Sequence, residues 1–304
     1  MGIDEAGYGP KLGPLIISAT LWQIPDSALA ATARAGPALD GQVDRDLDAL
    51  VARVVSRNAR DAGRADRLVI ADSKQLYHSG KGLKSLERVV LAGLATTGAK
   101  AQSWRTLWSS VADGTCDGFW ELPWHQQYDR ALPVDAAAAE VAAAETHFAY
   151  MAAELEVRLL AVRAAIVVPG QFNDRCDQCG SKGAALSELA LELAAELVRG
   201  LPVESTWIVW DKHGGRNKYA ALLQQYFPEW RVEVGHESTQ ESRYAAGPTE
   251  GRCRFCFRAG GEAFMPTALA SMTAKYLREL SMHAFNAYWR QCVPDIAPTA
   301  GYPS

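Results

Sequence analysis

The sequence predicts an α/β fold, because short apolar runs typical of strands alternate with longer amphipathic segments typical of helices. Residues 15–22 and 205–210 form apolar runs of strand length. Apolar side chains recur at helical spacing over residues 83–94 and 186–198. The 304 residues are enough for one large domain or two small ones, and we expect a single domain.

Composition and charge narrow the functional class. The chain is 48% hydrophobic and 22% charged, which is ordinary for a globular enzyme. The net charge of −4 and the pI of about 5.9 argue against a general nucleic-acid-coating protein, which would be basic. The sequence has neither a signal peptide nor an apolar run long enough to span a membrane, so we expect a cytoplasmic protein. We further expect it to be a monomer.

The first fourteen residues carry the most informative pattern. Asp4 and Glu5 are adjacent carboxylates, and Gly7 and Gly9 follow them closely. Neighbouring strand residues point to opposite faces, so both acids can face one site only if the backbone turns there, which glycine permits. Paired carboxylates beside a glycine-rich turn suit a divalent metal next to a phosphate. The alternative is an ordinary polar turn between two strands.

The next polar turn follows a short apolar strand over residues 67–71 and reads Asp72-Ser73-Lys74. Asp72 or Ser73 would cap the following helix, which is the simpler interpretation. The functional alternative is that Lys74 directs a flexible cation at a phosphate.

Four tryptophans lie close together at positions 104, 108, 120 and 124. Exposed aromatic rings could stack on bases. A small satellite core is the simpler explanation, because tryptophan is usually buried. The pattern after these residues predicts a long alanine-rich helix over residues 135–163 and a strand over residues 165–169.

A third acid, Asp211, follows the strand over residues 205–210 directly, and Lys212 and the Gly214-Gly215 pair come next. An acid at the C-terminal end of an apolar strand lies where open α/β sheets place their chemistry. A helix cap is the alternative, although a Gly-Gly pair is poor chemistry for starting a helix.

Two C-x-x-C pairs raise the question of structural Zn²⁺. Cys176-x-x-Cys179-Gly resembles half of a zinc knuckle, and Cys253-x-x-Cys256 is the only candidate for a second half. Strand alternation, however, puts Cys253 and Cys256 on opposite faces, so they cannot both bind one ion. We therefore expect buried or free thiols, with a zinc site as the alternative.

Residues 4–14, Asp-Glu-Ala-Gly-Tyr-Gly-Pro-x-x-Gly-Pro, resemble the opening motif of the type 2 ribonuclease H family, which comprises ribonuclease HII and its relatives. The family's motif has Gly-Arg-Gly where this chain has Gly-Tyr-Gly. Three further blocks follow in the family's order: Asp-Ser-Lys-x-Leu at 72–76, Ala-Ser-Met-x-Ala-Lys at 270–275 and Gly-Tyr-Pro at 301–303. The resemblance therefore spans most of the chain.

The resemblance implies a ribonuclease H-like α/β fold, in which a mixed five-stranded sheet is flanked by helices and the acids converge on one edge. Segments about 25–65 and 97–164 are then helical insertions within the domain. Glu262 stands where the family has its fourth metal-site aspartate, and we interpret Glu279 as an ion-pair partner on the surface of a helix. The implied catalytic and metal-binding residues are Asp4, Glu5, Asp211 and Glu262. The substrate-binding candidates are Gly7, Tyr8, Gly9, Lys74, Lys212, Ser271, Lys275 and Tyr302.

The implied activity is endonucleolytic hydrolysis of RNA in RNA–DNA hybrids, or of ribonucleotide-containing DNA, leaving 5′-phosphate and 3′-hydroxyl ends. The implied cofactor is a pair of Mg²⁺ or Mn²⁺ ions, one activating the attacking water and one stabilising the leaving oxygen. Two departures from the family's pattern, Tyr8 and Glu262, leave two alternatives open. The chain could be a non-catalytic nucleic-acid-binding homologue, or a nuclease for another structured nucleic acid.

Overall fold

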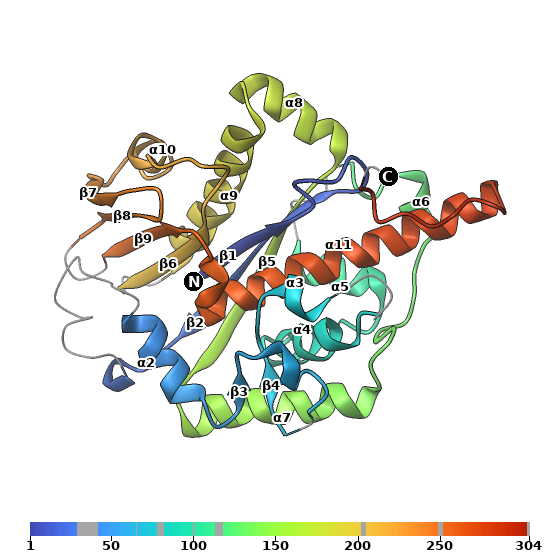
Figure 1. Cartoon of the computed structure of the whole chain (residues 1–304), viewed down its shortest axis with the longest axis horizontal. Coiled ribbons are helices and arrows are strands. Elements are labelled where there is room, and N and C mark those ends of the chain that lie inside the picture. Colours follow the sequence, from blue (N-terminus) through green and yellow to red (C-terminus); the bar gives the residue numbers. More distant parts are fainter. Residues whose placement is uncertain are drawn as a thin grey trace.

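A seven-stranded mixed sheet organises the computed structural model, which describes residues 1–28, 42–64, 66–77, 82–99, 101–112, 118–201, 205–248 and 252–302. The strand order is β5-β2-β1-β6-β9-β8-β7 (Figure 1). A separate parallel pair joins β3 (Val55–Ser56) to β4 (Leu68–Val69). The predicted α/β class is therefore confirmed. The strands of the main sheet are β1 (Gly2–Ala6), β2 (Leu15–Gln23), β5 (Arg158–Val167), β6 (Thr206–Asp211), β7 (Glu233–Glu237), β8 (Glu241–Ala246) and β9 (Cys253–Arg258).

The predicted number of five strands is wrong, because β7 and β8 add a hairpin to the sheet beside β9. β1 is antiparallel to β2 and parallel to β6, and β6 is parallel to β9. The hairpin was missed because its strands are rich in charged side chains, and in β8 they alternate with the buried residues that hold the strand on the sheet.

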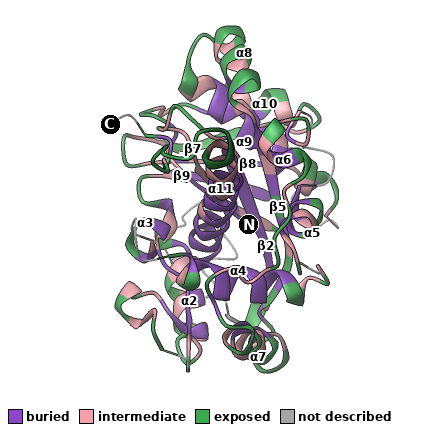
Figure 2. Cartoon of the chain, turned by 90° about the vertical axis from the view of Figure 1, so that its right-hand side faces the viewer, coloured by how far each residue is buried: buried purple, intermediate pink, exposed green. Residues whose placement is uncertain are grey.

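Helices cover both faces of the sheet. α8 (Pro169–Cys179), α9 (Lys182–Arg199) and α10 (Ala220–Tyr226) pack on the face that carries Ile3 and Ile17. The opposite face carries Ile16 and Val209 and is covered by α11 (Met265–Cys292), with α2 (Gln42–Val51), α4 (Lys84–Thr96) and α7 (Ala138–Glu154) around it. Figure 2 shows α11 as a largely buried helix in the middle of this layer.

The remaining helices are short: α3 (Ser73–Leu76), α5 (Trp104–Val111), α6 (Pro123–Gln126) and the 3₁₀ turns η1 (Asp26–Ala28), η2 (Ala59–Asp61) and η4 (Gly261–Ala263). Most of the expected insertion around residues 25–65 folds as α2, η2 and the β3–β4 pair. Residues 29–41 of that segment lie outside the described part of the chain.

The boundary between the predicted helix at 135–163 and the strand at 165–169 is wrong. α7 ends at Glu154 and β5 already begins at Arg158, so the segment 97–164 runs into the sheet itself. The stretch is rich in alanine, which favours helix by its intrinsic propensity. Pairing with β2 along the whole of β5 overrides that local preference.

The tryptophan-rich segment is buried, as the simpler explanation predicted, but it belongs to the large core cluster that also contains residues of α11 and not to a small satellite core. Trp104 and Trp108 are fully buried, and both rings contact Phe119. Trp120 and Trp124 are half-buried. In the part of the chain that the structure describes, we find no helix both long and apolar enough to cross a membrane.

Candidate functional site

Asp4 and Asp211 end up beside one another because adjacent parallel strands carry them. β1 and β6 pair as far as Ile3 and Trp210, and each acid is the next residue along its strand. The C-terminal ends of parallel strands meet at one edge of the sheet, which is where the sequence analysis expected the chemistry.

Glu5 follows Asp4 without a turn. Both residues lie inside β1, and the turn begins only after Ala6, where Gly7 has φ 98°. The expectation that the backbone turns at the acids is therefore wrong. Consecutive strand residues point to opposite faces, so the carboxylates of Asp4 and Glu5 approach the site from the two sides of the sheet.

Glu262 reaches the same place from η4, the short turn that connects β9 to α11. Gly261 packs directly on β6, since a Cβ there would lie 2.7 Å from the Asp211 nitrogen. The amides of Gly260 and Gly261 donate to Asp211 Oδ1 at 2.9 and 3.3 Å. These contacts fix the fourth predicted acid next to the third.

The first turn of α11 is anchored on the sheet. Thr267 Oγ1 donates to the carbonyl of Val209 at 3.1 Å, and a Cβ on Gly2 would lie only 2.0 Å from the Thr267 nitrogen. One helical turn later, Ser271 lies near enough to the Asp4 carboxylate to lower its pKa slightly. The hydroxyl of Ser271, a substrate-binding candidate, lies 3.0 Å from the Ser73 hydroxyl.

Burial and mutual repulsion dominate the electrostatics of the site. Asp4 is only 6% exposed, and burial followed by the charges of Glu5 and Glu262 raises its pKa well above the usual range. Burial and the charges of Asp211 and Glu262 raise the pKa of Glu5 to about 7. The site therefore holds more negative charge than its protein surroundings balance.

Lys74 forms an ion pair with one of these acids. Its Nζ lies 3.6 Å from Glu262 Oε1, and its side chain is 78% exposed. Burial alone would lower the pKa of Lys74, but Glu262, Asp4 and further acids raise it overall. Asp72 accepts a hydrogen bond from the Lys74 nitrogen at 2.9 Å, so the predicted helix cap is confirmed. The same turn directs Lys74 towards the four acids.

The donor set fits a hard divalent cation by its chemistry, because all four side chains offer carboxylate oxygens. The positions of these four side chains fit a metal ion less well than their chemistry does. Among the described residues, no group of three or more His, Cys, Asp or Glu side chains is arranged to hold a metal ion. Asp4 and Glu5 leave opposite faces of β1, and Asp211 is turned to the amides of η4. Rotation of these carboxylates about their side-chain bonds would be needed to close a shared site.

Tyr8 stands where the related motif has arginine. Its ring packs edge-on against Phe172 of α8, with ring centroids 6.4 Å apart. Burial, followed by the negative charge of Glu5, raises the pKa of Tyr8. Gly9 is at the other end of the turn, where a Cβ would lie 3.8 Å from the ring of Tyr302. Tyr302 itself is 57% exposed.

The two remaining lysine candidates are held by protein partners. Lys212 Nζ donates to Asn217 Oδ1 at 2.8 Å and to the carbonyl of Ser238. Lys275 Nζ lies 2.6 Å from Glu279 Oε1 and 4.5 Å from the ring centroid of Tyr77. Neither ammonium group is therefore directed at the acids by its contacts.

Glu279 is an ion-pair partner, as expected, but it does not lie on the surface. It is 5% exposed and also accepts a hydrogen bond from the Tyr77 hydroxyl at 2.9 Å. The surface assignment failed because α11 is buried along most of its length, so a polar position in its sequence still faces the core.

The cysteine pairs lie in different local structures. Cys176 and Cys179 are in the last turns of α8 instead of a knuckle, and Cys179 Sγ donates to Glu188 Oε2 at 3.1 Å. Cys253 and Cys256 belong to the core clusters on opposite faces of the sheet, as strand alternation predicted. Burial raises the pKa of both of these thiols to about 11.

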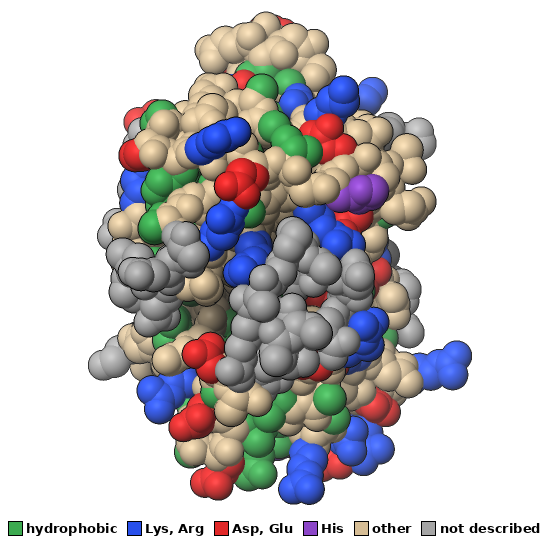
Figure 3. Space-filling view, turned by 90° about the vertical axis from the view of Figure 1, so that its left-hand side faces the viewer, with side chains coloured by type: hydrophobic (Ala, Val, Ile, Leu, Met, Phe, Trp, Pro, Cys, Tyr) green, Lys and Arg blue, Asp and Glu red, His purple; other side chains and the backbone are tan. Residues whose placement is uncertain are grey.

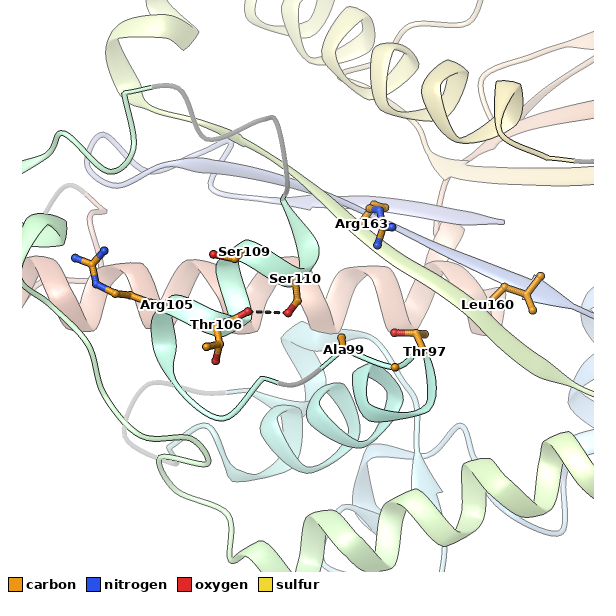
Figure 4. A pocket seen from close by; sticks show the side chains of 9 residues that line it. Thr97, Ala99, Arg105, Thr106, Ser109, Ser110, Leu160 and Arg163 are labelled. Atoms are coloured by element: carbon orange, nitrogen blue, oxygen red, sulfur yellow. Dashed lines mark hydrogen bonds between the residues drawn. The ribbon is translucent and has the colours of Figure 1, made fainter.

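A cavity of about 610 Å³ lies between α5, residues 97–99 and the edge strand β5 (Figure 4). Arg105 and Arg163 are at opposite ends of it, and Ser109 and Ser110 lie between them. None of the predicted site residues lines this cavity. The chemistry of the four acids is therefore separate from it.

Arg278 is the residue around the site that the sequence analysis missed. Its guanidinium lies under the Tyr302 ring, 5.9 Å from the ring centroid, and bonds the glycine-rich turn. Its signal was its position seven residues after Ser271, on the same face of a helix. Comparisons of the chain with protein-family models and with curated proteins find no match.

Proposed function

We propose that the protein is a metal-dependent endonuclease that hydrolyses the RNA strand of RNA–DNA hybrids. The observation that carries this proposal is the convergence of Asp4, Glu5, Asp211 and Glu262 from three separate segments of the chain. Burial and repulsion between them raise the pKa of Asp4 and Glu5. Such an excess of negative charge is relieved by divalent cations, which nucleases of this chemistry use.

The arrangement of the sheet supports a ribonuclease H-like fold as part of this proposal. β5, β2, β1, β6 and β9 form a mixed block of five strands, with helices on both faces. The acids lie at the ends of its two central strands and in the turn after β9. On this view the β7–β8 hairpin is an addition to the edge of a five-stranded sheet.

Asp4, Glu5, Asp211 and Glu262 would hold Mg²⁺ or Mn²⁺. The chemistry that the bound ions would supply is activation of the attacking water and stabilisation of the leaving oxygen. The protein's own groups orient at least one of the acids, because the η4 amides of Gly260 and Gly261 donate to Asp211. The exposed ammonium of Lys74 is free to move from Glu262 to a substrate phosphate, which would leave Glu262 available as a ligand.

The surface charge supports local, site-directed binding of nucleic acid. On the face around the β7 edge of the sheet, Lys and Arg side chains are interspersed with Asp and Glu (Figure 3). A net charge of −4 likewise gives little general attraction to phosphate. We therefore expect salt-sensitive binding through a few contacts near the acids.

Cleavage of labelled substrates by the purified full chain tests the proposal. We expect cleavage of an RNA–DNA hybrid with Mg²⁺ or Mn²⁺, none with EDTA, and none by Asp4→Asn or Asp211→Asn. Asp66→Asn is the matched control, because Asp66 is an exposed acid paired only locally with Arg64. Full activity in either site variant would remove the assignment. A duplex with one ribonucleotide and a plain DNA duplex define the substrate range.

A non-catalytic hybrid-binding protein is the second candidate. It is favoured by the side-chain positions, since the acids do not form a closed three-ligand group and Lys74 pairs with Glu262. Such a protein would shift an RNA–DNA hybrid in a gel but leave it intact with either metal ion. Turnover of the hybrid would eliminate this candidate.

A further inference from the structure

Three glycines with positive φ meet around one buried arginine. Gly7, Gly13 and Gly301 have φ values of 98°, 85° and 86°. A Cβ on Gly7 would lie 3.0 Å from Arg278 Nε, and a Cβ on Gly301 would lie 3.0 Å from Arg278 Nη2. Arg278 comes from α11 and is 1% exposed. The backbone therefore closes around the guanidinium at points where a larger residue would collide with it.

The guanidinium joins two segments that are far apart in sequence. Arg278 Nη2 donates to the carbonyl of Leu12 at 2.9 Å and to the carbonyl of Ala300 at 3.1 Å. The amides of Lys11 and Leu12 in turn donate to the carbonyl of Gly301 at 2.9 and 3.2 Å. Figure 1 shows the β1–β2 turn and the end of the described chain side by side.

The arrangement hides the arginine and presents a tyrosine. The Tyr302 ring lies over the guanidinium and next to Gly9, yet more than half of Tyr302 is exposed. A nucleic-acid strand at the glycine-rich turn could contact Tyr302 and the backbone at Gly9, whereas it could not reach Arg278.

Arg278 is retained at a cost to stability. Its Nε and Nη1 are buried and have no hydrogen-bond partner among the described residues, although Nη1 lies 3.9 Å from Glu279 Oε1. Buried donors without acceptors destabilise a fold, so a residue that carries two of them calls for a role beyond packing.

We propose that Arg278 is a positioning residue that holds Tyr302 against the glycine-rich turn, so that the two form one surface for the RNA-containing strand. This inference rests on the proposed function for its substrate. Its structural part, the coupling of the turn to segment 299–302, is independent of any activity. This chain has tyrosine where the related motif has arginine. Arg278 on α11 places a guanidinium beside the same turn, where it acts through Tyr302 without touching the substrate.

The first test needs no activity and uses hydrogen exchange of the Lys11 and Leu12 amides in the full chain. Arg278→Met removes the bridge, and Gly301→Ala displaces the same segment through a Cβ that would lie 2.4 Å from the Leu12 oxygen. Both variants should speed exchange at these two amides at least about tenfold relative to the wild type. Unchanged exchange in Gly301→Ala or in a folded Arg278→Met would overturn the coupling.

Arg105→Met is the matched control. Arg105 is also a clamp, because its Nη2 donates to the carbonyl of His125 at 2.7 Å and its guanidinium lies 5.3 Å from the Trp120 centroid. It lies on α5, away from the glycine-rich turn. Exchange at Lys11 and Leu12 should therefore stay at the wild-type rate, and acceleration in this variant would show that any loss of stability produces the effect.

The second test uses hybrid cleavage. Tyr302→Ala and Arg278→Met should each raise KM about tenfold while kcat changes by less than about threefold, because stacking contributes to binding. The KM of the double variant should be no higher than that of Tyr302→Ala alone. Arg278→Lys should raise KM less than Arg278→Met, because lysine keeps the positive charge but not the planar guanidinium. Additive effects, or a fall in kcat alone, would overturn the positioning role. Absence of cleavage in the wild type, with coupled hydrogen exchange intact, would overturn the proposed function instead.

Discussion

The molecule buries carboxylates in two regions and treats them in opposite ways. Glu87 on α4 is fully buried and accepts hydrogen bonds from the amides of Val134, Asp135 and Ala136 at 2.6–2.8 Å, and from the Tyr276 hydroxyl at 2.7 Å. Asp4, almost as buried, faces the carboxylates of Glu5 and Glu262, and burial together with their charges raises its pKa.

This difference separates a structural acid from a candidate functional one. Hydrogen-bond donors surround both oxygens of the Glu87 carboxylate. Three of these donors are backbone amides of the loop before α7, so the carboxylate holds that loop in place. Asp4 and Glu5 have raised pKa values because they are buried and face neighbouring carboxylates, an arrangement that costs stability unless a cation joins them. Charge imbalance in a buried group is therefore the feature that marks the site.

The largest loss of stability should come from a substitution of Glu87, whose carboxylate is fully hydrogen-bonded. Glu87→Gln replaces acceptor oxygen with an NH₂ group that faces backbone amides, and we expect a loss of about 3–5 kcal/mol in the free energy of unfolding. Urea denaturation of the two proteins measures it. Asp66→Asn, at an exposed ion pair, should change the stability little. If Glu87→Gln lost no more stability than Asp66→Asn, the contrast between Glu87 and the acids around Asp4 would be wrong.

A second buried ionisable group, His125, should also set a limit at low pH. Burial lowers the pKa of His125 to about 4, and its Nδ1 is 2.8 Å from the carbonyl of Phe119. The unfolded chain binds this proton near pH 6.5, before the folded chain does, so stability is lost as pH falls from 6.5 to 4. The loss from this one group amounts to about 3 kcal/mol at full extent.

His125→Asn isolates that contribution, because an amide can still donate to the Phe119 carbonyl. Its stability at pH 7 should be lower than that of the wild type, but it should fall less steeply between pH 6.5 and 4.5. His213, whose pKa burial also lowers to about 4, remains in both proteins and cancels from the difference. Equal slopes for the two proteins would contradict the prediction.

We expect a divalent metal ion to stabilise the protein through the site around Asp4 and not through the region around Glu87. At a concentration of Mn²⁺ or Mg²⁺ about 100 times Kd, we expect a gain of about 2.7 kcal/mol, seen as a higher midpoint of thermal unfolding. Glu87→Gln should keep this gain and Asp4→Asn should lose it. A gain that persists in Asp4→Asn would place the metal elsewhere.

The smallest effect is a stabilisation. Without metal, Asp4→Asn removes one of the repelling charges and should raise the free energy of unfolding by about 1–2 kcal/mol, because sites built for function are rarely at a stability optimum. Differential scanning calorimetry in EDTA measures the change. Destabilisation by this substitution would mean that Asp4, like Glu87, is balanced by its surroundings.

Local features of the site follow directly from the sequence. The strand that carries Asp211, the cap that Asp72 makes and the opposite faces of Cys253 and Cys256 all depend on periodicity or on neighbours a few residues away. Gly7 is of the same kind, because a residue without Cβ fits its φ of 98° best, whereas Gly9, which the sequence also suggested for the turn, has no positive φ. These properties need no knowledge of the remote chain.

Long-range packing decided the rest. The alanine content of residues 158–167 favoured a helix, but this segment forms β5 because it pairs with β2 along its length. Whether a polar residue of α11 faces solvent or core depends on what covers the helix, so Glu279 was misplaced and Arg278 was missed. Periodicity is a short-range property of the chain, whereas the contacts that join Arg278 to Gly301 and Lys74 to Glu262 exist only once distant segments have packed together.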